Sequence, residues 1–79
     1  MIRNNELECY LKELFIVDHN CFVTLERAQQ ILNEFCMKKG ITSDLVGPHL
    51  LRAFPHTRYT KAHVDGRRRV VFDALRRAD

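Results

Sequence analysis

The chain has 79 residues, of which 46% are hydrophobic, and its 13 Lys/Arg against 10 Asp/Glu give a formal net charge of +3. This length predicts a single domain with a small core. We expect that domain, residues 1–79 with a core over about 5–75, to be part of a larger protein. There is no run of about 18 apolar residues, and residues 1–10 are mostly polar, so we expect neither a membrane span nor a signal peptide.

The first expected element is a helix that runs to about Phe15, with Asn4 or Asn5 as its N-cap. Its apolar residues recur at helical spacing and form one stripe that faces the core. A turn of polar residues over 17–20 and a short extended piece over 21–23 should follow.

A second helix is predicted over about 25–39. Thr24 has the position and chemistry of an N-cap, and Gly40 is well placed as the left-handed residue that ends the helix. The residues expected to face the core recur at steps of three and four; they are Leu25, Ala28, Leu32, Phe35 and Cys36.

Ser43 is the predicted N-cap of a third helix that ends at about Ala53. Pro48 lacks a backbone donor, so the helix either bends there or properly begins there. Its inner face should hold Leu50, Leu51 and Phe54, and its outward face should hold His49 and Arg52.

The rest of the chain predicts a β-hairpin, because Asp65-Gly66 is the strongest two-residue turn signal and separates two strand-like runs over 56–64 and 67–75. A two-residue loop sets the opposed pairs: Tyr59 with Phe72, Thr60 with Val71, Lys61 with Val70, and Ala62 with Arg69. We expect Tyr59, Val70 and Phe72 on the core side. Arg67 and Arg69 should share the outer face, with Arg68 on the inner side beyond the core.

Charge is unevenly divided along the chain. Residues 1–51 hold five Lys/Arg against seven Asp/Glu, a net of −2, whereas residues 52–79 hold eight Lys/Arg against three Asp, a net of +5. A small domain with a basic hairpin is typical of contact with a polyanion, because Lys and Arg that neutralise phosphates release condensed counterions. A two-stranded ribbon is also narrow enough to enter the DNA major groove.

The order of helices and strands predicts an α+β winged helix, in which three helices pack on a small antiparallel sheet with a basic hairpin wing. We therefore expect double-stranded DNA as the partner, with the wing contributing more than the third helix. The candidate contacts are Arg58, Lys61, His63, Arg67, Arg68 and Arg69 on or beside the hairpin, and Arg52 and His49 on the third helix. Replacing Arg67, Arg68 and Arg69 together should abolish binding, whereas replacing Arg27 should not.

Other roles remain open for the same hairpin. It could dock an acidic protein or a neighbouring subunit, since a fold never settles function, or it could be a charged edge that prevents aggregation. Binding of single strands or RNA ranks last, because Tyr59 alone offers an exposed ring for stacking.

Catalysis and metal binding are not expected. The sequence has no nucleophile elbow, no zinc-protease motif and no Gly-rich phosphate loop, so we predict no enzyme activity, no cofactor and no small-molecule substrate. The nearest pair of metal-ligating types, His19 and Cys21, lacks zinc-site spacing. We expect semi-buried, reduced thiols, as in an intracellular protein, at Cys9, Cys21 and Cys36.

The chain resembles the RFX-type winged-helix family over about residues 10–75. The resemblance is carried by Tyr10-Leu11-Lys12-Glu13, Phe35-Cys36, Gly47, Phe54-Pro55, Arg58 and Gly66-Arg67. The chain is also similar to the related C-terminal domain of poxvirus and phage primase–helicases, through the segment Val70–Arg76. The resemblance implies double-stranded DNA as ligand, a wing in the major groove, and a role in transcription regulation or DNA replication, in the nucleus or wherever a viral or phage replication complex acts.

Overall fold

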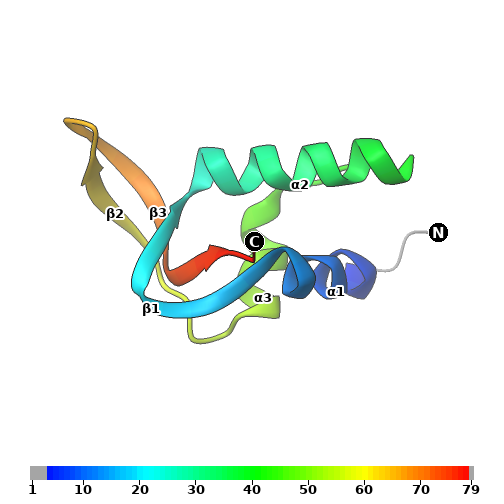
Figure 1. Cartoon of the computed structure of the whole chain (residues 1–79), viewed down its shortest axis with the longest axis horizontal. Coiled ribbons are helices and arrows are strands. Elements are labelled where there is room, and N and C mark those ends of the chain that lie inside the picture. The colour runs from blue at the N-terminus through cyan, green and yellow to red at the C-terminus, as the bar shows by residue number, and fades with distance from the viewer. Residues whose placement is uncertain (1–3, 79) are drawn as a thin grey trace.

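The computed structural model describes residues 4–78, which form three helices and three strands. In chain order these are α1 (Asn4–Leu14), β1 (Phe15–Thr24), α2 (Leu25–Lys39), α3 (Val46–Ala53), β2 (Tyr59–Val64) and β3 (Arg67–Arg77). Figure 1 shows the helices gathered toward one end of the long axis and the sheet toward the other. The expected α+β class, with three helices and a small antiparallel sheet, is confirmed, and that sheet has three strands. No helix within residues 4–78 is long and apolar enough to cross a membrane.

The core lies where α1, α2 and α3 meet the base of the sheet. Each element supplies a fully buried residue: α1 has Leu11, α2 has Leu32, α3 has Leu50 and β3 has Phe72. The other members of the cluster are Leu7, Phe15, Val23, Ala28, Ile31, Cys36, Val46, Ala53, Phe54 and Leu75. The expected helical stripes are confirmed in part. Leu7, Ala28 and Leu50 are buried as predicted, whereas Leu25 and Leu51 only pack against the edge of the core, and Ile31 is a buried residue that the prediction omitted.

Both predicted ends of α2 are confirmed. The Thr24 hydroxyl accepts a hydrogen bond from the Arg27 backbone N–H at 3.1 Å, which satisfies one of the free donors of the first turn. Gly40 has φ 70°, the left-handed region that a residue without Cβ enters at little cost, and its N–H bonds the carbonyl of Met37.

The start of α3 differs from the prediction. The helix begins at Val46, and Ser43 does not cap it, because the Ser43 hydroxyl donates to Asn33 instead. The cap comes from α2: Gln29 Oε1 accepts from the Val46 N–H at 2.9 Å. A side chain 17 residues away in sequence therefore performs the role that was expected of a neighbour. Pro48 lies in the first turn, where a missing N–H costs least.

The segment after α1 also differs. The expected polar turn over 17–20 lies inside a single strand, β1, which begins at Phe15. The register with β3 shifts between Val17 and Phe22, so that residues 18–21 bulge opposite Ala74 alone. Ala74, on the strand opposite the bulge, has φ 56°, in the left-handed region. The proposed cap of α1 falls on Asn4 and Asn5, whose side chains lie outside the described residues.

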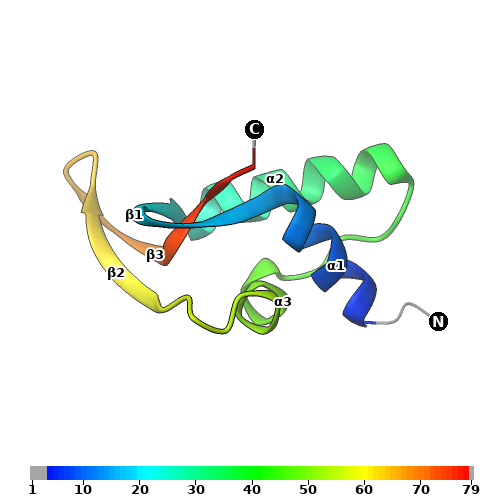
Figure 2. The same ribbon diagram turned by 60° about the horizontal axis from the view of Figure 1, so that its bottom comes forward.

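The sheet has the order β1-β3-β2, with both pairs antiparallel. Its two edge strands cover different halves of β3. β1 pairs from Phe15↔Arg77 to Thr24↔Val71, and β2 pairs from Tyr59↔Phe72 to Val64↔Arg67. Beyond Val71 the hairpin consequently continues as a two-stranded ribbon without a third strand. Figure 2 shows this part of β2 and β3 reaching away from the helices.

Candidate nucleic-acid interface

The free ribbon, defined here as residues 61–70, is the part of the hairpin that pairs with no third strand. It covers four residue pairs, from Lys61↔Val70 to Val64↔Arg67, and extends roughly 13 Å at about 3.3 Å per residue. Asp65 and Gly66 both have positive φ, 53° and 76°, which is the conformation of the turn that matches strand twist. The hairpin and all four predicted pairs are thus confirmed.

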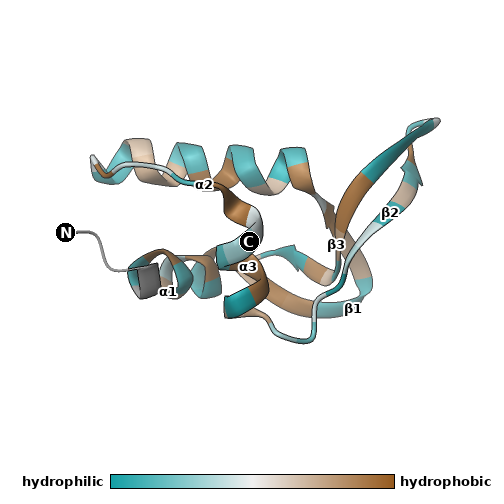
Figure 3. Ribbon diagram, turned by 180° about the vertical axis from the view of Figure 1, so that it is seen from behind, coloured by the Kyte–Doolittle hydropathy of each residue, from teal (hydrophilic) through white to brown (hydrophobic). Residues whose placement is uncertain are grey.

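Cations lie along this ribbon and beside its base. Arg58, Lys61, Arg67 and Arg68 are exposed, and none of them forms an ion pair with another described residue. Figure 3 shows the hydrophilic end of β3 next to the turn, followed by the hydrophobic stretch that enters the core. The change occurs over a few residues because β1 and the helices cover only the second part of β3.

The register distributes these cations over both faces of the ribbon. His63 opposes Arg68, so these two side chains share one face with Lys61. Arg67 and Arg69 share the other face, as predicted. A ribbon that is cationic on both faces can meet phosphates on either side of a groove.

Arg69 departs from the expectation that it lies on an outer, solvent face. Its side chain is 28% exposed, and its Nη1 lies 2.6 Å from Oε2 of Glu26, in the first turn of α2. The pair ties the ribbon to the helix. A small cleft of about 240 Å³ between them is also lined by Arg27. Arg27 therefore lies next to the hairpin. It is not far enough from the proposed DNA contacts to serve as the control substitution that the sequence suggested.

His49 was expected on the outward face of α3, and that expectation is wrong. Its side chain is buried, with Nδ1 3.1 Å from Arg52 Nη2 and Nε2 2.9 Å from Asp44 Oδ2. Arg can only donate, so Nδ1 accepts and Nε2 carries the hydrogen that is donated to Asp44. This hydrogen bond is the main reason why the pKa of Asp44 is lowered.

Arg52 is exposed as predicted, but its charge is already engaged. Its Nε lies 2.6 Å from Glu8 Oε1, so the pair joins α3 to α1. Together with His49, this ion pair gives the polar end of α3 a structural role. The surface around the start of α3 is apolar instead, with Leu45 71% exposed and Pro48 also exposed.

Two other predicted features can be compared with the structure. Tyr59, expected on the core side, packs its ring 5.3 Å from that of Phe72 yet remains 52% exposed, because it lies at the rim of the sheet.

All three cysteines are free, but Cys9 is exposed and not semi-buried. Burial raises the pKa of the Cys36 thiol. Among the residues described, no three His, Cys, Asp or Glu side chains are grouped as metal ligands.

The acidic residue in the bulge of β1, Asp18, also has a structural role. Asp18 Oδ1 accepts from the Asn20 N–H at 3.0 Å, and its Oδ2 lies 3.1 Å from Arg76 Nε. The backbone hydrogen bond is the largest reason why the pKa of Asp18 is lowered. Arg76, near the end of β3, is therefore paired and separate from the ribbon.

Comparison of the chain with protein-family models, curated proteins and solved structures gave no match. The geometry of the hairpin alone carries the argument for function.

Proposed function

We propose that this chain is a winged-helix domain of the kind that RFX-type proteins contain, and that it binds double-stranded DNA through its β2–β3 hairpin. The wing would neutralise phosphates and place one or two arginines at base edges in the major groove, in transcription regulation or DNA replication. The support is a single observation: four exposed cations, with no ion pair to a described residue, gather on and beside a ribbon that extends from the body (Figure 1).

We infer different roles for the candidate contacts. Arg58, Lys61, Arg67 and Arg68 would bind DNA directly, with His63 beside them on the ribbon. Arg69 would orient the wing through Glu26, since that ion pair connects the ribbon to α2. His49 and Arg52 are left out of the interface, because the first is buried and the second is bonded to Glu8.

An acidic protein surface is the competing ligand for the same cations. Duplex DNA is favoured because a narrow two-stranded ribbon with charge on both faces fits a groove bounded by two phosphate rows, whereas a flat acidic surface would meet only one face. DNA also carries its charge at high density, one negative charge per about 1.7 Å of duplex axis.

The test compares labelled duplex DNA, single-stranded DNA, RNA and polyglutamate in fluorescence anisotropy at about 100 mM salt, where screening is partial. We expect the tightest binding to the duplex and a large loss for Arg67→Ala/Arg68→Ala. The matched control is Lys38→Ala/Lys39→Ala, which removes the same charge from the last turn of α2. Tighter binding to polyglutamate than to duplex would support the protein-docking role instead. Equal loss in both double variants would show that net charge, and not the wing, sets affinity.

A further inference from the structure

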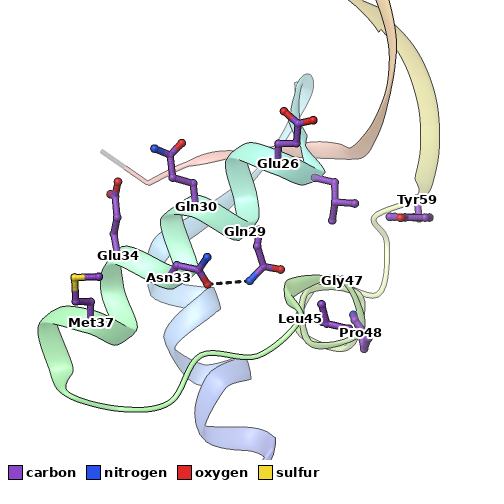
Figure 4. A pocket seen from close by; sticks show the side chains of 11 residues that line it. Glu26, Gln29, Gln30, Asn33, Glu34, Met37, Leu45, Gly47, Pro48 and Tyr59 are labelled. Carbon is purple, nitrogen blue, oxygen red and sulfur yellow. Dashed lines mark hydrogen bonds between the residues drawn. The ribbon is translucent and has the colours of Figure 1, made fainter.

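An apolar groove runs between α2 and the start of α3, on a part of the surface that the proposed DNA contacts do not use. Its volume is about 650 Å³, and Tyr59 closes one end of it (Figure 4). Leu25, Leu45, Pro48 and Met37 supply much of its lining. Met37 and Leu45 are 81% and 71% exposed, so large apolar side chains lie open to water here.

The Gln29 amide and the Asn33 amide oxygen in the groove are occupied by hydrogen bonds within the protein. Gln29 Nε2 donates to the Asp44 carbonyl at 2.8 Å and to Asn33 Oδ1 at 3.0 Å, while Gln29 Oε1 accepts from Val46. Asn33 Oδ1 also accepts from the Ser43 hydroxyl. Because these bonds hold the amides in place, the groove presents mainly carbon and suits an apolar ligand surface.

The wall formed by α2 has the shape of a helix-packing surface. Leu25, Gln29, Asn33 and Met37 recur at every fourth residue, and a second row is formed by Glu26, Gln30 and Glu34. Rows at this spacing form ridges into which the ridges of another helix interdigitate. The row from Leu25 to Met37 extends about 18 Å, which equals a little over three turns of a partner helix.

The acidic side chains beside the groove indicate the charge of its partner. Glu34 is exposed and forms no ion pair with another described residue, whereas Glu26 is paired with Arg69. An acidic, apolar surface repels phosphates and favours a cationic group on whatever docks there. This surface therefore differs in chemistry from the basic ribbon.

We propose that the α2–α3 groove docks an amphipathic helix of about three turns from a partner protein. Its apolar residues would pack against Met37, Leu45 and Tyr59, and a Lys or Arg beside them would pair with Glu34. The proposal does not rest on DNA binding, since none of the residues of the proposed wing contacts, Arg58, Lys61, Arg67 and Arg68, lines the groove.

The probe is a fluorescein-labelled, alanine-based helical peptide of about 14 residues, with Leu at every fourth position and one Arg beside that row. A second peptide has Glu in place of the Arg. We expect saturable binding of the Arg peptide with a Kd below about 1 mM, and a loss of at least about tenfold for Leu45→Asp or Met37→Asp, since each removes an apolar anchor. Leu45→Asp places a favourable residue at the N-cap of α3, so the variant should fold.

Val17→Asp is the matched control, because Val17 is 48% exposed but lies on β1, outside the groove. Glu34→Lys should weaken the Arg peptide and strengthen the Glu peptide. The proposal is overturned if neither peptide binds, if Leu45→Asp and Val17→Asp lose binding equally, or if Glu34→Lys changes neither preference. Sedimentation that shows a wild-type dimer and a Leu45→Asp monomer would assign the groove to a second copy of this chain and also overturn it. The affinity for duplex DNA should be the same in wild type and Leu45→Asp. A negative result for peptide docking is therefore distinguishable from a negative result for DNA binding by the hairpin.

Discussion

Replacing Arg67 and Arg68 with alanine should change the salt dependence of DNA binding by a calculable amount. Four cations, Arg58, Lys61, Arg67 and Arg68, are exposed and form no ion pair with a described residue. If each neutralises one phosphate, the logarithm of affinity should fall with the logarithm of salt with a slope of about −3.6. Between about 50 and 200 mM salt, wild-type affinity should then fall about 150-fold.

The double variant keeps two of these contacts, so its slope should be about −1.8 and its affinity should fall only about 12-fold over the same range. Arg69→Ala should leave the slope close to the wild-type value, because Glu26 already holds that charge. The assay is fluorescence anisotropy of a labelled duplex over the salt series. A slope that is the same in the double variant and wild type would refute the reasoning. So would an equal decrease in the control Lys38→Ala/Lys39→Ala.

Three further predictions concern stability, each measured by urea unfolding. Thr24→Ala removes the cap of α2 and should lower the free energy of unfolding by about 1 kcal/mol; no change would mean that the cap is replaced by water. Phe72→Ala, at a fully buried position, should cost about 3–5 kcal/mol, close to the whole stability of a small domain. Phe22→Ala, at a side chain that is 47% exposed, should cost far less, and equal losses would contradict the packing described. The pKa of Asp44 is lowered chiefly by the hydrogen bond from His49, so this carboxylate stabilises the fold above the ordinary Asp pKa of about 3.9, and the contribution is lost as the pH falls through the lowered pKa. Asp44→Asn should reduce the decrease in the free energy of unfolding at acidic pH. If the free energy of unfolding depends on pH in the same way in this variant and in wild type, other groups cause the decrease.

Most features set by neighbouring residues were predicted correctly, whereas the turn expected over 17–20 was not, because those residues lie in β1. The two-residue turn at Asp65-Gly66 requires positive φ at both positions, and it sets the register of every pair that follows. Thr24 and Gly40 mark the two ends of α2 and were also predicted from local sequence, because a cap interacts only with the adjacent turn of the helix. In each case the outcome depends on the backbone conformation of one or two residues, and the residue types at those positions favour that conformation directly.

Predictions that depended on distant partners were less successful. Ser43 has the chemistry of a cap, but Gln29 reaches the start of α3 first once α2 and α3 are packed together. His49 reads as a polar residue on an exposed helix face, but hydrogen bonds to Asp44 and Arg52 allow its burial. Polar residues can be buried when they are paired, and their pairing follows from packing and not from spacing.

The candidate interface shows the same division. Composition placed the positive charge in residues 52–79, and the turn placed three arginines at the end of a ribbon. The residues that hold the charges of Arg52 and Arg69, namely Glu8 and Glu26, lie 44 and 43 residues away in the chain. Local residue pattern was therefore sufficient for the hairpin and its charge, because strand alternation and turn geometry act over a few bonds. The choice of which arginines remain available to a ligand required the packed helices, because an ion pair forms only where folding brings its two partners within a few ångströms.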